Sequence, residues 1–136
     1  MARKLISSGS YLEPEIGFSR AVRVGPYIAI AGTAPIAVGG GTAAPGSVYG
    51  QTIRCLEIIN QAVVSAGGVI ANVIRTRVML VDISKWREAA KAHGEFFRDI
   101  RPTTTFVQVS GFVDPAWLIE IEADCVLEDL KTYNSD

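Results

Sequence analysis

The chain has 136 residues, of which 49% are hydrophobic, 13 are basic and 14 are acidic, so that its formal net charge is −1. This length predicts a single domain over residues 1–136 with a sizeable buried core. The charge balance lacks the basic excess that nucleic-acid-binding proteins carry, and the apolar runs are too short to span a bilayer. We therefore expect a soluble, cytoplasmic protein that binds neither nucleic acid nor membrane.

Three β-rich segments are predicted near the N-terminus. Residues 4–6 can form an edge strand, and residues 18–24 and 27–32 are separated by the turn pair Gly25-Pro26, which predicts a hairpin. A run rich in Gly, Ala and Pro follows the hairpin and predicts a loop. Its three consecutive glycines are not followed by the Gly-Lys-Ser/Thr of a phosphate-binding loop, and we expect no cofactor.

Two helices are predicted, each with one apolar stripe. The first runs from Ser47, a suitable N-cap, to Ala66, and the second from Ser84 to Arg98. Residues 73–81, between them, predict a central strand. His93 lies on the apolar stripe of the second helix, which favours a packed histidine with one hydrogen-bonded nitrogen over a catalytic one.

Cysteine and histidine are scarce in this chain. Two cysteines, Cys55 and Cys125, make no disulfide framework, and one histidine is too few for a metal cluster. Both cysteines fall on predicted apolar faces, where buried thiols are the favoured interpretation. We expect no metal site.

Residues 101–127 predict two strands joined by a turn, which contains Gly111, Asp114 and Pro115. Alternation predicts one apolar face made by Val107, Val109, Ile119, Ile121, Ala123 and Cys125. The opposite face is predicted to carry Thr104, Phe106, Gln108, Glu120 and Glu122. Two helices cover only one side of such a sheet. The other side, which Arg75 and Arg77 share, predicts self-association.

The chain resembles the RidA family, the YjgF-like reactive intermediate deaminases. The resemblance rests on GFSRAVRVG, YIAIAGTAP, QTIRCLEIINQAVVSAGG, VIRTRVMLVDISKW and the C-terminal Ile-Glu-Ile-Glu-Ala, and it covers nearly the whole chain. It implies an α+β, chorismate-mutase-like domain with two helices on one face of a mixed, mainly antiparallel sheet. It also implies a homotrimeric barrel with small-molecule clefts between neighbouring subunits.

The resemblance further implies hydrolysis of imine and enamine products of amino acids. In the family an arginine binds the substrate carboxylate, a glutamate positions or activates water, and a tyrosine and a backbone pair beside a glycine hold the ligand. The glutamate corresponds to Glu120 and the glycine to Gly32. Three positions depart from the family: Thr104 stands in place of the arginine, Phe18 in place of the tyrosine, and Phe106 where cysteine is frequent.

These departures indicate an arginine-less branch and weaken the expectation of activity on amino-acid imines. Arg20 shares strand parity with Phe18 and is our candidate for the missing positive charge, although surface arginines on hairpins are usually solvated. Glu120 has an alternative role as half of an ion pair with Arg75 or Arg77. Trp117 is expected either to line the cleft or to pack.

Three functions follow as hypotheses. The first is a hydrolase or deaminase with Glu120 as the acid/base group, and the second is a protein that binds a small, largely apolar metabolite without turnover. The third, an endoribonuclease or translation inhibitor, echoes an old label of the family and is disfavoured by the net charge of −1. Retention of Glu120 favours the first, and the three departures favour the second.

Overall fold

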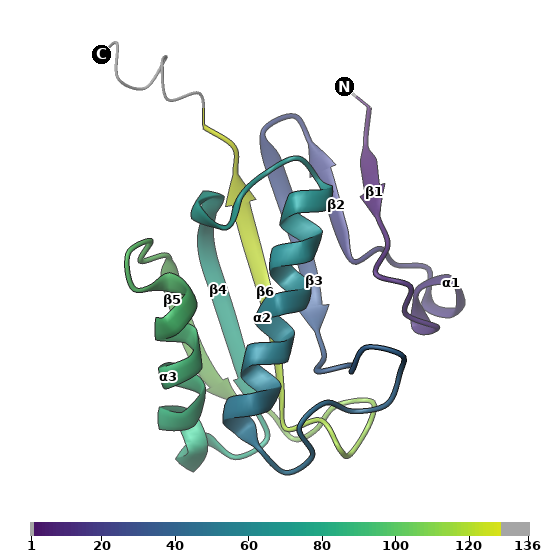
Figure 1. The fold of residues 1–136 in the computed structure, drawn as a ribbon. Helices are drawn as coiled ribbons and strands as arrows, with labels where there is room; N and C mark the ends of the chain where they lie inside the picture. Colours follow the sequence, from purple (N-terminus) through teal and green to yellow (C-terminus); the bar gives the residue numbers. More distant parts are fainter. Residues whose placement is uncertain (1, 129–136) are drawn as a thin grey trace.

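The computed structural model describes residues 2–128. Its chain order is β1 (Lys4–Ile6), α1 (Leu12–Ile16), β2 (Ala21–Val24), β3 (Tyr27–Thr33), α2 (Val48–Ser65), η1 (Ile70–Asn72), β4 (Val73–Leu80), η2 (Ile83–Lys85), α3 (Trp86–Phe97), β5 (Thr103–Gln108) and β6 (Ile119–Val126) (Figure 1). The short helix α1 is the one α-helix of this part of the chain that we did not predict.

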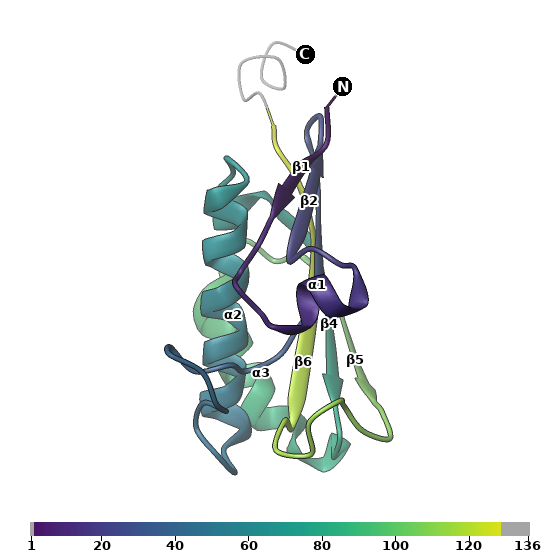
Figure 2. The same cartoon turned by 90° about the vertical axis from the view of Figure 1, so that its right-hand side faces the viewer.

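The six strands form one sheet in the order β1-β2-β3-β6-β4-β5. The pair β4–β5 is parallel and the other neighbouring pairs are antiparallel. Figure 2 shows α2 and α3 together on one side of this sheet. The predicted α+β class, with two helices on one face of a mixed, mainly antiparallel sheet, is confirmed. Within residues 2–128 no helix is both long and apolar enough to cross a membrane.

The apolar residues at alternate positions of β6 and the apolar stripe of α2 form much of the core. Ile119, Ile121, Ala123 and Cys125 are buried as predicted, and they meet the buried residues of α2, which include Cys55, Leu56, Ile59 and Val63. The predicted start of this helix is also confirmed, because the Ser47 hydroxyl accepts a hydrogen bond of 3.0 Å from the Gly50 N–H. The core therefore lies between the sheet and its two helices.

The predicted faces of β5 are wrong. Thr104 is aligned with Thr76 and Phe106 with Val78, and both partners on β4 are buried under the helices. Thr104 and Phe106 thus face α3, whereas Val107 points to the other side and is 41% exposed. The prediction treated β5 and β6 as neighbours and placed Val107 and Val109 on the same apolar face as the buried residues of β6. In the structure β4 separates the two strands, and at this sheet edge Phe106 is the larger apolar group to bury.

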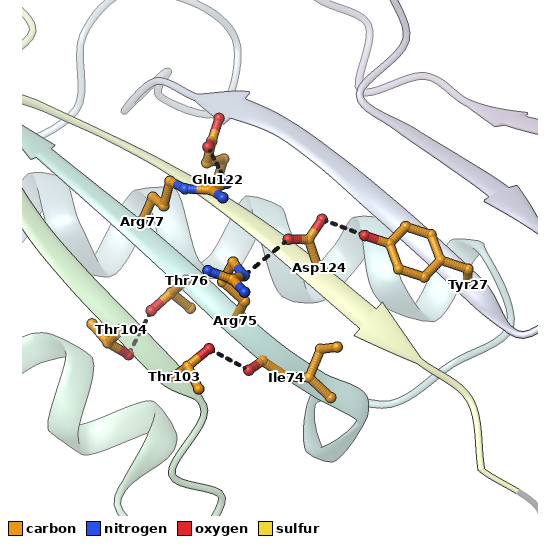
Figure 3. Close-up of polar contacts among 9 residues, drawn as sticks. All are labelled: Tyr27, Ile74, Arg75, Thr76, Arg77, Thr103, Thr104, Glu122 and Asp124. Atoms are coloured by element: carbon orange, nitrogen blue, oxygen red, sulfur yellow. Dashed lines mark hydrogen bonds and ion pairs between the residues drawn. The ribbon is translucent and has the colours of Figure 1, made fainter.

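The side of the sheet opposite α2 and α3, which we call the open face, carries paired charges. Arg77 contacts Glu122 at 2.7 Å, and Arg75 lies 3.7 Å from Asp124, which also accepts a hydrogen bond from the Tyr27 hydroxyl at 3.1 Å (Figure 3). Each ion pair joins β4 to β6 directly across the strands. Both arginines of β4 therefore have carboxylate partners within the chain.

Candidate functional site

Glu120 lies on the open face beside Gly32 of β3. The register of β3 and β6 shifts between Ile30 and Thr33, so that Gly32 sits in a bulge. A Cβ atom on Gly32 would stand 2.9 Å from Oε1 of Glu120. Glycine is thus the residue that lets the carboxylate approach the β3 backbone closely, and the two residues carried over from the family are neighbours here.

Glu120 is half-buried, and this burial raises the pKa of its carboxyl group. The charge of Arg20 opposes the rise and that of Glu122 adds to it. The alternative role of Glu120 as an ion-pair partner is taken by its neighbours, because Arg75 and Arg77 contact Asp124 and Glu122. A carboxylate with a raised pKa and no arginine contact among residues 2–128 is suited to exchange protons.

Arg20 lies just before β2 and is only 4% exposed. Its Nη1 donates hydrogen bonds to the Gly32 carbonyl at 2.8 Å and to Thr33 Oγ1 at 3.2 Å, and its Nε donates to Ser8 Oγ at 3.2 Å. The guanidinium carbon is 5.3 Å from the centre of the Phe18 ring. Four predicted site residues, Phe18, Arg20, Gly32 and Glu120, therefore form one group, which we call the glutamate cluster.

Thr104 and Phe106 belong to a second group, at the outer edge of the sheet. The hydroxyls of Thr104 and Thr76 are 2.8 Å apart, and His93 Nε2 lies 2.9 Å from Thr76 Oγ1 and 3.5 Å from Thr104 Oγ1 (Figure 3 shows the threonine pair). The His93 ring packs against Phe97, with ring centres 4.6 Å apart, and lies edge-on to Phe106. We call this group the threonine cluster.

His93 is packed and hydrogen-bonded through one nitrogen, as predicted. Burial lowers the pKa of its imidazole, which favours the neutral ring. Sequence reasoning missed the link from His93 to Thr104. The signal was available: Thr76 is a polar residue on the helix-facing side of a central strand, and a buried hydroxyl there requires a partner.

Within one chain the two clusters do not meet. Glu120 faces the open side from β6, whereas Thr104 faces α3 from β5, and β4 lies between these strands. A concavity of about 370 Å³ beside Thr104 is lined also by His93, Arg98, Arg101 and Pro102. A larger cavity, of about 1040 Å³ beside α2, includes Arg20 but none of the other predicted site residues.

Trp117 lies in the turn before β6 and is 5% exposed. Its backbone N–H donates to the Asp114 carbonyl at 3.1 Å, as in a β-turn over residues 114–117. This burial within one chain favours the packing alternative over a place in a cleft.

Comparisons with known proteins agree with the fold. The family model described as endoribonuclease L-PSP matches residues 9–127. The chain belongs to this family, which is also known as the YjgF or RidA family. A solved member of the YjgF/YER057c/UK114 family from Mycobacterium tuberculosis is 40% identical, with a TM-score of 0.84 over 93% of this chain and 100% of its own.

Two relatives in the YjgF family differ in what is known of them. An uncharacterized protein of Streptomyces coelicolor is 35% identical over 90% of this chain and 91% of its own length. The 2-iminobutanoate/2-iminopropanoate deaminase of Bos taurus is 27% identical over 97% of this chain and 96% of its own. The imine deaminase is thus a distant relative, but one that matches along nearly the whole chain.

Proposed function

We propose that the protein is a cytoplasmic homotrimer that binds a small metabolite in clefts between neighbouring subunits. The open face supports self-association, because the half-buried Met79 and the exposed Val107 lie on it among charges that are already paired. The separation of the two clusters supports a shared cleft. Each cluster holds only part of the predicted site, and a second copy can supply the other part.

The reaction we propose is the hydrolysis of an imine or enamine. Glu120 accepts a proton from water while the water oxygen bonds to the C=N carbon, and the nitrogen gains a proton. The resulting carbinolamine then loses ammonia and leaves a carbonyl product, so that one water is consumed for each ammonia released. The observation that carries this proposal is the half-buried Glu120 carboxylate, held against Gly32 and not paired with Arg75 or Arg77.

Binding without turnover is the second candidate. The hydroxyl of Thr104 is already hydrogen-bonded to Thr76, and Phe106 packs partly into the core. These two residues offer a ligand a hydroxyl and an aromatic edge in place of a guanidinium. This composition favours a ligand with little or no negative charge.

Ammonia release distinguishes the two candidates. Imines are generated in place by an amino-acid oxidase from a broad panel of amino acids, and ammonia is followed with the native protein, with Glu120→Gln and with no protein. The hydrolase proposal expects acceleration by the native protein alone. No acceleration over the whole panel would leave the binding protein, whose ligand would then be sought by thermal shift with uncharged metabolites.

Thr104→Arg is expected to increase the rate on imines that bear a carboxylate by about tenfold to a hundredfold, since a charge-assisted, forked contact contributes about 1.5–3 kcal/mol. The effect should appear as a lower KM in the ammonia assay. Thr104→Gln is the control, because it adds length without charge and should give no gain. Equal behaviour of the two variants would mean that position 104 does not face the substrate carboxylate.

Gly32→Ala is expected to lower the rate by about tenfold to a hundredfold, as small displacements of a catalytic group do. The added methyl would push Glu120 Oε1 away, and because that atom ends a flexible side chain the fold should tolerate the change. Gly111→Ala is the control, since its Cβ would meet nothing within 4 Å. A large loss of unfolding free energy in Gly32→Ala would show that the glycine serves the fold instead.

A further inference from the structure

Arg20 is the buried member of the glutamate cluster, and the Nε and Nη1 atoms of its guanidinium donate to groups of the protein itself. Three hydrogen bonds tie it to Ser8 before α1 and to Gly32 and Thr33 in the bulge of β3. All three acceptors are uncharged, and the 4% of the residue that is exposed lines the large cavity beside α2. The contacts fix the backbone around Gly32, and the cavity that Arg20 lines contains none of the other predicted site residues.

The charge of Arg20 is not neutralised by direct contact. Among residues 2–128 no carboxylate lies within ion-pair distance of it. Glu13 is reached only through Ser8, whose hydroxyl donates to Glu13 Oε2 at 3.0 Å and accepts from Arg20. A guanidinium cannot lose its proton in a protein, so a permanent positive charge stands beneath Gly32, in a poorly screened environment.

The charge of Arg20 affects the pKa of the Glu120 carboxyl group. Burial raises this pKa, and Arg20 is the group that opposes the rise. The other ionisable groups near Glu120 are Glu122, which adds to the rise, and the thiol of Cys55, which stays neutral because burial raises its pKa. Arg20 thus donates a hydrogen bond to the Gly32 carbonyl, and its charge stabilises the ionised form of Glu120.

We infer that Arg20 is a positioning residue of the glutamate cluster: it holds Gly32 and Thr33 in the bulge against which Glu120 lies and supplies a permanent positive charge near that carboxylate, without contacting the substrate. This replaces the ligand-binding role that the sequence predicts for Arg20. The inference rests on the proposed function only for the catalytic meaning of Glu120, because the contacts themselves belong to the folded chain.

The chain provides a matched control in Arg23 of β2. Its Nε donates to the Gly25 carbonyl and its Nη1 to the Ala66 carbonyl, both at 2.8 Å. It therefore makes the same kind of backbone contacts three residues further on, but it is not among the groups that influence the Glu120 carboxyl. Arg20→Met removes three hydrogen bonds to backbone or hydroxyl groups and Arg23→Met removes two, and only the first substitution removes the charge near Glu120.

The test is the carboxyl titration of Glu120, followed by carbon NMR in the full-length protein without substrate. Arg20→Met is expected to move the titration to higher pH and to speed hydrogen exchange at Gly32 and Thr33, whereas Arg23→Met leaves both unchanged. Arg20→Lys, which keeps the charge but lacks the fork, should keep the titration near that of the native protein while exchange at Gly32 still rises. If Arg20→Met does not fold, the inference is tested with Arg20→Lys alone, by the same titration and hydrogen-exchange measurements.

An Arg20→Met protein whose Glu120 titrates as in the native chain would overturn the inference, as would unchanged exchange at Gly32 in Arg20→Lys. Failure of the proposed function appears separately, as absence of ammonia release by the native protein whatever the titration. Where ammonia is released, the acidic limb of the pH–rate profile should move to higher pH in Arg20→Met. A purely structural arginine would lower the amount of active protein and leave that limb in place.

Discussion

Glu120→Gln is expected to lower the rate of ammonia release by about a hundredfold or more, the usual contribution of a positioned general base. Glutamine keeps the shape of the side chain but cannot accept a proton from water. Subunit assembly and the free energy of unfolding should stay close to native, because Arg75 and Arg77 pair with Asp124 and Glu122 instead of Glu120. Ammonia assays and light scattering measure the two effects.

Glu122→Gln is the matched control for this prediction. It lies two residues further along β6 on the same face, but its carboxylate contacts Arg77 at 2.7 Å and is therefore not free to accept a proton from water. Its rate should stay near native. Dissociation of the assembly by Glu120→Gln would instead give Glu120 a structural role at the subunit contact.

The pH dependence of the native rate has a defined sign. The base must be ionised, and burial raises the pKa of Glu120 above its ordinary value. The rate should therefore rise with pH through this raised pKa and fall away on the acid side at a higher pH than an exposed glutamate would give. An acid limb at or below the position of an ordinary glutamate would contradict the assignment.

Ile121→Ala is expected to lower the free energy of unfolding by about 2–5 kcal/mol, the range for truncating a buried isoleucine. Ile121 is fully buried on β6, which β3 and β4 flank on both sides. The cavity would open in the middle of the core, where rigid strands on both sides limit collapse around it. Urea unfolding at one fixed protein concentration measures the change, since assembly also affects stability.

Ile16→Ala in α1 is the control for this substitution. The side chain of Ile16 is 63% exposed, so the same truncation should change the unfolding free energy by no more than about 0.5 kcal/mol. Equal losses in the two variants would mean that β6 is not the centre of the core.

Elements with strong periodicity could be predicted from the sequence. Alternation in 119–125 is that of a strand with one buried face, and Ser47 caps a helix with an apolar stripe from Cys55 to Val63. Strand order is not contained in such local patterns. The succession of strand 73–81, helix 84–98 and a further strand is nevertheless typical of a parallel pair with a helical crossover, and it would have placed β5 beside β4 and Thr104 under α3.

The candidate site was only partly predictable, for a physical reason. Glu120 and Gly32 could be identified from the family motif, but the burial of Arg20 depends on a bulge between Ile30 and Thr33 that alternation does not reveal. The hydrogen bond that connects Thr76 to His93 joins β4 to α3 across the core. Contacts of this kind are set by tertiary packing and not by the spacing of residues along one element.

The most direct measurement mixes two inactive chains. Glu120→Gln disables the glutamate cluster, and Thr104→Trp blocks the concavity of the threonine cluster. If each cleft takes one cluster from each of two neighbouring subunits, a random equal mixture rebuilds about one cleft in four from two intact clusters. We predict recovery of about a quarter of the native ammonia release. No recovery above that of the separate variants would contradict a site shared between subunits, because a site within one chain cannot be restored by mixing.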